Sequence, residues 1–164
     1  MRSIVAACAG TMLGLFALVS IVRADEEKIP LKDVPKAALD AVKAKFPGAE
    51  LTGAEKETEN GKTTYEVALK DKGQNVDVAV TAAGKILEIE KEIAAKDLPK
   101  AVSAALEAKY PKATIKKAEA ITEFKEAGEE HAFEVVVVKT DKKSVEVKLS
   151  PQGKILEEES GDGN

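Results

Sequence analysis

Residues 97–111 read DLPKAVSAALEAKYP and residues 33–47 read DVPKAALDAVKAKFP, so one stretch of sequence occurs twice. Each copy carries a proline near its start and ends in an aromatic residue followed by proline. Proline suits the first turn of a helix but cannot continue one, so each stretch predicts a helix with marked ends. In residues 97–111 the large apolar residues recur every four positions, as in one buried stripe: Leu98, Val102, Leu106 and Tyr110.

The two predicted helices cover residues 34–45 and 98–109, and we expect Asp33 and Asp97 to cap them. Two further matches follow the helices in the same order in both copies. They pair Tyr65-Glu66-Val67 with Phe133-Glu134-Val135, and Gly84-Lys85-Ile86-Leu87-Glu88 with Gly153-Lys154-Ile155-Leu156-Glu157. Ordered matches at a period of about 65 residues indicate an internal repeat.

Between turn signals such as Asp71-Lys72-Gly73, apolar residues alternate with polar ones. They are Tyr65, Val67, Leu69, Val76, Val78 and Val80 in the first copy, and Phe133, Val135, Val137, Val145, Val147 and Leu149 in the second. This period of two predicts an antiparallel sheet with one covered face, and the helix is its natural cover. We therefore predict an α+β fold of two tandem repeats, each with one helix packed on a four-stranded antiparallel meander.

Residues 1–24 differ in composition from the rest of the chain. Arg2 precedes an uncharged apolar stretch at residues 4–22, and Val22-Arg23-Ala24 resembles the end of a signal peptide. We therefore predict a secretory signal peptide at residues 1–24 and a periplasmic or secreted protein. Two alternatives are an uncleaved membrane anchor, for which 19 apolar residues suffice, and lipidation of Cys8, which has too few apolar residues before it.

The predicted organisation of the exported chain follows from the repeat. The first repeat covers residues 25–93, and the second covers residues 94–159. Residues 160–164 form a disordered acidic tail, because chain ends with small and polar residues are seldom held in place.

Removal of residues 1–24 changes the balance of charges. Both arginines leave, so the 25 basic residues fall to 23 lysines against 29 acidic residues, a net charge of −6. An acidic chain without arginine or tryptophan is a poor match for nucleic acid. It also offers no polybasic patch to a membrane surface. We expect neither nucleic-acid binding nor membrane insertion after signal cleavage.

The sequence contains no recognisable catalytic or metal-binding motif. His131 is the only histidine and Cys8 the only cysteine, so a zinc site lacks ligands, and no serine lies in a nucleophile elbow. Acidic residues on the polar side of the strands have the pattern of a solvated sheet face: Glu66, Asp77, Glu134 and Glu146. We therefore predict that the chain is not an enzyme and uses no cofactor or metal.

A helix ending in Phe46-Pro47 or Tyr110-Pro111, followed by the two matched motifs above, resembles the PepSY-like superfamily. The doubled arrangement resembles the β-lactamase-inhibitor-like proteins over residues 29–159. This resemblance implies an exported, non-catalytic module, of which some relatives are proposed to bind or inhibit proteins. The inhibitor itself has an aromatic-rich contact face and disulfides, whereas this chain has five aromatic residues and no cysteine after residue 24. That departure argues against β-lactamase as the target.

One strand breaks the alternation of polar and apolar faces. Val135-Val136-Val137-Val138 is apolar on both sides, where the first copy has Val67-Ala68-Leu69-Lys70. Val136 and Val138 point away from the helix under the period of two. Two-sided burial is the usual meaning of such a run, so the other repeat or, less favoured, a partner protein covers them. We take this pair as a candidate interaction or repeat-packing surface.

The sequence therefore predicts an exported, non-catalytic PepSY-like module that binds an unidentified protein through its exposed sheet face, in the manner of an inhibitor. The alternative is binding of a small ligand or calcium by the acidic surface in the periplasm.

Mass spectrometry of the exported protein is expected to find Asp25 at the mature N-terminus, because the cleavage-like residues end at Ala24 and an acidic stretch follows. Detection of Met1, or of a lipid on Cys8, would contradict this prediction.

Overall fold

The computed structural model describes residues 25–59 and 61–161, so the predicted signal peptide lies outside the described residues. The described residues form two helices and nine strands: one strand comes first, and each helix is then followed by four strands. The helices are α1 (Lys36–Lys45) and α2 (Lys100–Lys109). The strands are β1 (Asp25–Lys28), β2 (Glu50–Glu59), β3 (Lys62–Asp71), β4 (Gln74–Thr81), β5 (Ile86–Glu92), β6 (Thr114–Lys125), β7 (Gly128–Val138), β8 (Ser144–Leu149) and β9 (Ile155–Gly161).

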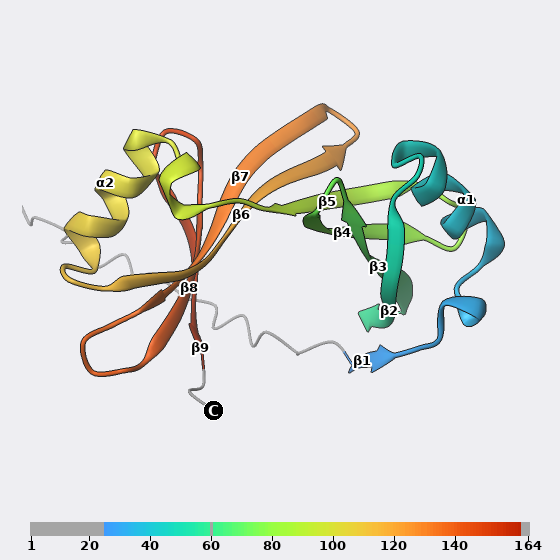
Figure 1. Ribbon diagram of the computed structural model, residues 1–164, viewed down its shortest axis with the longest axis horizontal. Coiled ribbons are helices and arrows are strands. Elements are labelled where there is room, and N and C mark those ends of the chain that lie inside the picture. Colours follow the sequence, from blue (N-terminus) through green and yellow to red (C-terminus); the bar gives the residue numbers. More distant parts are fainter. Residues whose placement is uncertain (1–24, 60, 162–164) are drawn as a thin grey trace, which may run out of the picture.

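All nine strands form one antiparallel sheet in which every strand lies beside its neighbours in sequence. The α+β class and the antiparallel pairing agree with the sequence prediction. The sequence analysis did not predict β1, which pairs with β2. The sheet is continuous because residues 88–92 of β5 pair with residues 119–123 of β6. Figure 1 shows the twisted sheet with α1 and α2 at opposite ends of the molecule.

Both helices cover the same face of the sheet. In an antiparallel ladder, residues directly opposite each other point to the same side. From Val78, beneath α1, such pairs lead through Ile89 and Thr122 to His131. Two residues further along each strand, Lys91, Ala120 and Phe133 are paired in the same way and point to the same side. They continue this face to the residues beneath α2. The opposite side, here called the helix-free face, is covered by no helix among the described residues.

Each helix packs on its own apolar cluster. Ala38 and Val42 of α1 lie over buried residues of β3, β4 and β5, namely Val67, Leu69, Val76, Val78, Val80 and Ile89. Val102 and Leu106 of α2 lie over Ala118, Val135, Val137, Val147 and Leu149. The predicted apolar stripe of residues 97–111 is thus the buried side of α2, although Tyr110 at its end is only partly buried.

The prediction that Asp33 and Asp97 cap the helices is wrong. Both aspartates end short 3-10 turns, at Leu31–Asp33 and Ala95–Asp97, and Pro35 and Pro99 occupy the N-cap positions without a side-chain cap hydrogen bond. Proline forces the residue before it into an extended conformation. Val34 and Leu98 accordingly have ψ angles of 133° and 142°, which separate each aspartate from the helix that follows.

The predicted tail begins too early. Ser160 and Gly161 belong to β9, which pairs with β8, so these two residues extend the sheet edge. Residues 162–164 lie outside the described part of the chain. The predicted boundary between residues 93 and 94 falls between β5 and the 3-10 turn that precedes α2.

Gly84, in the β4–β5 turn, lets the sheet approach α1 closely. Its φ angle is +87°, and a Cβ atom there would lie 2.7 Å from the carbonyl oxygen of Ala37. Gly153 has the same relation to α2, because its Cβ would lie 2.4 Å from the carbonyl oxygen of Ala101. The two glycines of the matched Gly-Lys-Ile-Leu motif therefore set the distance between each helix and its sheet.

Replacement of Gly84 with alanine is expected to destabilise the protein more than the same change at Gly73. Both residues have φ +87°, but a Cβ at Gly73 would meet no atom within 4 Å. Gly73→Ala should cost only the strain of the left-handed backbone, about 1–2 kcal/mol. Gly84→Ala adds a clash with the α1 backbone and should cost about 2–5 kcal/mol in total. Urea unfolding measures both, and equal losses would show that the close approach to α1 is unimportant.

Candidate functional site

The helix-free face carries rows of side chains that cross the sheet. One row runs from Asp77 in β4 through Glu90 in β5 and Ile121 in β6 to Ala132 in β7. The next row contains Glu92, Glu119, Glu134, Lys148 and Glu157, from β5 to β9. Acidic residues that are far apart in sequence are thus neighbours in the middle of this face.

The middle of this face is screened from water although no helix covers it. Ile121 is 2% exposed and Ala132 is 5% exposed, and neither belongs to the apolar clusters beneath the helices. Glu119 is 3% exposed, and among the described residues it is the one charged residue that is buried. Charged groups here therefore lose much of their hydration and need a compensating charge or proton.

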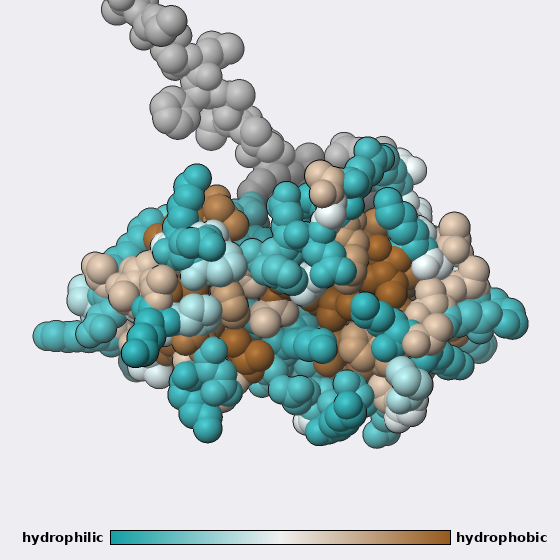
Figure 2. Space-filling view, turned by 90° about the horizontal axis from the view of Figure 1, so that it is seen from above, coloured by the Kyte–Doolittle hydropathy of each residue, from teal (hydrophilic) through white to brown (hydrophobic). Residues whose placement is uncertain are grey.

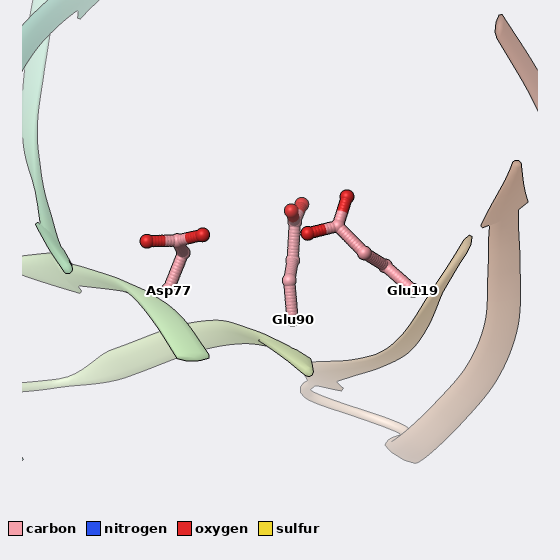
Figure 3. A group of neighbouring side chains, drawn as sticks. All are labelled: Asp77, Glu90 and Glu119. Carbon is pink, nitrogen blue, oxygen red and sulfur yellow. The ribbon is translucent and has the colours of Figure 1, made fainter. Parts of the chain in front are cut away.

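Three carboxylates meet at this position. Oxygen atoms of Asp77, Glu90 and Glu119 lie within 4.8 Å of one another, which is close enough to hold a metal ion. Figure 3 shows their side chains rising from neighbouring strands on the same side of the sheet. The ammonium of Lys117 lies 2.8 Å from the Glu119 carboxylate, so Glu119 already has a cationic partner.

Burial and mutual repulsion raise the pKa values of these acids. Burial raises the pKa of Glu90 to about 9, and the nearby charges of Glu134 and Glu88 add to the effect. Burial and the charge of Glu146 raise the pKa of Glu134 to about 7. Burial also raises the pKa of Asp77, partly offset by Lys117. With a pKa of about 9, Glu90 keeps its proton at neutral pH, which relieves repulsion within the cluster.

A second group of charges lies beside the first and is balanced by lysines. Lys148 Nζ lies 2.6 Å from Glu123 and 3.7 Å from Glu88. Lys125 lies 2.8 Å from Glu123 and 2.5 Å from Glu130. Hydrogen bonds from Lys125 and Lys148 lower the pKa of Glu123. Here the acids are paired with lysines, in contrast to Glu90 and Glu134.

Val136 and Val138 lie on the helix-free face, as the period of two predicts, and both are half-buried. Val136 stands between Lys117 of β6 and Glu146 of β8, and Val138 between Thr114 and Ser144. Neither valine belongs to the two apolar clusters. The pair therefore forms a small apolar area beside the charged middle of the sheet.

Sequence reasoning found only part of this site. It took the strand acids Asp77 and Glu134 for a solvated face, whereas both are half-buried, and it did not single out Glu90 or Glu119. Their alternation with apolar residues is the same as that of any exposed strand face. The β4–β5 pairing places Asp77 beside Glu90 and the β6–β7 pairing places Glu119 beside Glu134, and the β5–β6 pairing then joins these two pairs. His131 is exposed, and its Nδ1 lies 3.3 Å from the Thr122 hydroxyl.

Comparison with known families gives two overlapping matches. The model described as "Putative beta-lactamase-inhibitor-like, PepSY-like" matches residues 74–157, just over half of the chain. The PepSY model, described as "Peptidase propeptide and YPEB domain", matches residues 35–90. No curated protein matches the chain.

Several solved structures share the fold. A BLIP-like protein from Bacteroides fragilis is 24% identical, with a TM-score of 0.60, and the match covers 83% of this chain and 89% of that one. A structure from Bacteroides eggerthii, described as "putative periplasmic proteins", has a TM-score of 0.65 at 15% identity and covers 77% and 88%. A DUF2874 family protein from Bacteroides uniformis has a TM-score of 0.64 at 16% identity, with coverage of 77% and 88%.

The melting temperature is expected to fall as the pH rises from 4.5 through 7 towards 9. The folded state raises the pKa of Glu90 from 4.5 to about 9 and that of Glu134 to about 7. It therefore binds these protons more tightly than the unfolded chain does. The resulting stabilisation is complete below pH 4.5 and is lost as the pH passes the folded-state values.

Glu90→Gln should flatten this profile, because glutamine carries no charge at any pH, whereas Glu107→Gln on the exposed side of α2 should leave it unchanged. Thermal melts across this pH range test both variants. A parallel fall in Glu90→Gln and wild type would contradict the role of the carboxyl cluster.

Proposed function

We propose that this chain, which belongs to the beta-lactamase-inhibitor-like, PepSY-like family, is an exported, non-catalytic module. It binds another protein through its helix-free face. The signal-like composition of residues 1–24 supports export. The similar fold from Bacteroides eggerthii, described as periplasmic, is consistent with that location. Among the described residues, no helix is long and apolar enough to cross a membrane.

The observation that carries the proposal is the one-sided cover of the sheet. Both helices and both apolar clusters lie on one side, and the middle of the other side holds half-buried carboxyl groups and two valines. Burial and the neighbouring acids keep a proton on Glu90 in spite of the charge of Lys117, so this carboxyl group gains from a further cation brought by a partner. The helix-free face is thus suited to a protein surface that presents lysine or arginine.

We further propose that the two halves are copies of one unit, residues 25–93 and 94–159. In each half one helix precedes four strands, and the helix C-cap is aromatic, Phe46 or Tyr110, with φ angles of −124° and −122°. The equivalent close approaches of Gly84 to α1 and of Gly153 to α2 support the same conclusion.

The chemistry of the helix-free face differs from that of an aromatic interface. All five aromatic residues after residue 24 pack with the two apolar clusters on the helix side: Phe46, Tyr65, Tyr110, Phe124 and Phe133. Aromatic anchors dominate the binding energy of many interfaces. Binding through the other face therefore depends on charge and on the Val136–Val138 area, which does not favour β-lactamase as the partner.

Calcium binding is a weaker candidate for the same place. Asp77, Glu90 and Glu119 come close enough to share an ion. However, Lys117 already lies 2.8 Å from Glu119, and its charge acts on both Asp77 and Glu90. Calcium takes about six to eight oxygen ligands, whereas Glu119 is paired with Lys117 and burial raises the pKa of Glu90 to about 9. Two of the three carboxyl groups are therefore poor ligands for an ion, so we favour the protein interface.

A double variant tests the interface. Val136→Lys with Val138→Lys places two charges in the apolar area, and it should abolish capture of the partner from an envelope fraction while it leaves the melting temperature nearly unchanged. Stability should persist because both valines are half-buried and lie outside the apolar clusters. A large loss of stability would instead indicate cover within the chain.

The matched control is Ala104→Lys with Ala108→Lys, which adds the same charge at exposed positions of α2, on the other side of the sheet. This variant should capture the partner as wild type does. If both double variants capture it equally well, the helix-free face is not the interface.

A further inference from the structure

We propose that a cavity on the helix side, between the C-terminal end of α1 and strands β5 and β6, binds the carboxylate of a small ligand with an apolar body. Its volume is about 380 Å³, within the usual range of small-molecule sites. Residues from α1 and its C-cap, the β3–β4 turn and strands β5 to β7 line it. Figure 2 shows an apolar area flanked by hydrophilic side chains in the half of the view that holds α1.

The cavity combines cationic and aromatic walls. Lys45, Lys72 and Lys91 line it together with Phe46 and Phe124. Lys45 Nζ lies 5.4 Å from the centre of the Phe124 ring, and Lys91 Nζ lies 5.6 Å from that of Phe46. An ammonium over an aromatic ring keeps its hydrogen-bond donors available for an anion.

The cavity is not uniformly cationic, because Asp71 and Glu129 also line it. Three lysines against these two acids still leave a net positive charge in a protein that is acidic overall. The net positive charge of the cavity therefore favours a ligand with a single negative group, and the rings of Phe46 and Phe124 favour a ligand with an apolar body.

In the second half of the chain, a carboxylate occupies the position that is equivalent to this cavity, at the C-terminal end of α2. There the aromatic C-cap of α2 is Tyr110, and both its hydroxyl and the ammonium of Lys109 donate hydrogen bonds to the carboxylate of Glu158. Lys109 and Tyr110 correspond to Lys45 and Phe46 at the end of α1. The end of α2 is thus occupied by a carboxylate that belongs to the chain itself.

In the first half this carboxylate is replaced by an apolar residue. Glu158 of β9 lies opposite Val147, and by the same register Ile89 of β5 lies opposite Val78. The lysine at the end of the helix is retained, a second lysine is added at Lys91, and the position equivalent to Glu158 holds no acid. The three lysines of the cavity thus outnumber its two acids and have no counterpart of Glu158 beside them, so we assign the role of that carboxylate to a ligand.

Titration with 3-phenylpropionate and with octanoate, followed by amide chemical shifts, tests the site with an aromatic and an acyl body. We expect saturable shifts at residues of the cavity, and binding at least 10-fold weaker for 3-phenylpropionamide, which has the same body without the charge. Loss of one charge-assisted contact in Lys91→Gln or Lys45→Gln should raise the Kd about 10-fold or more.

Lys43→Gln is the matched control, since Lys43 lies on the same helix, is exposed and does not line the cavity. Its Kd should equal that of wild type. The inference is overturned if neither acid shifts the cavity residues, if the amide binds as tightly as the acid, or if Lys45→Gln and Lys91→Gln bind as wild type does. None of these results bears on the helix-free face, so the proposed protein interface is tested separately.

Discussion

The pairing of β5 with β6 is the contact on which the other features depend. It joins nine strands into one sheet, and it places Glu92 opposite Glu119 and Glu88 opposite Glu123. Like charges directly opposite one another oppose strand pairing. The backbone ladder and the apolar side chains on the helix side must outweigh this repulsion. Lysines balance Glu119 and Glu123, and Glu90 next to them is balanced by a retained proton.

The position of both helices on one side divides the molecule chemically. All aromatic residues of the described chain pack on the helix side of the sheet, so a ligand that needs contacts with aromatic rings can make them only on that side. The helix-free face keeps charges that burial has partly stripped of water. Such charges discriminate strongly between partners, because a cation in the wrong place leaves them uncompensated. The two faces are therefore suited to different classes of ligand.

The sequence predicted the local structure well and the long-range arrangement poorly. Alternating valines gave the strands, and the paired prolines gave both helices to within two residues. The acidic stretch Asp25–Lys28 has no apolar residue to mark it as a strand, so β1 was missed. The burial of Glu119 could not be predicted from the sequence either, because it arises from β5–β6 pairing and not from any pattern within β6. Pairing between distant strands is set by the whole sheet.

The ends of the two helices show how a single position can change what a site does. Lysine and an aromatic ring stand at the end of each helix, and the residue facing them from the sheet is Glu158 in one half and Ile89 in the other. A glutamate fixed in the sheet meets the lysine at little entropic cost, and the charge is satisfied within the chain. Isoleucine in its place adds to the apolar core but leaves the cations of the cavity without that internal partner. The exchange of Glu158 for Ile89 therefore distinguishes the two helix ends: one is closed by a carboxylate of the chain, and the other is where we propose that the carboxylate of a ligand binds.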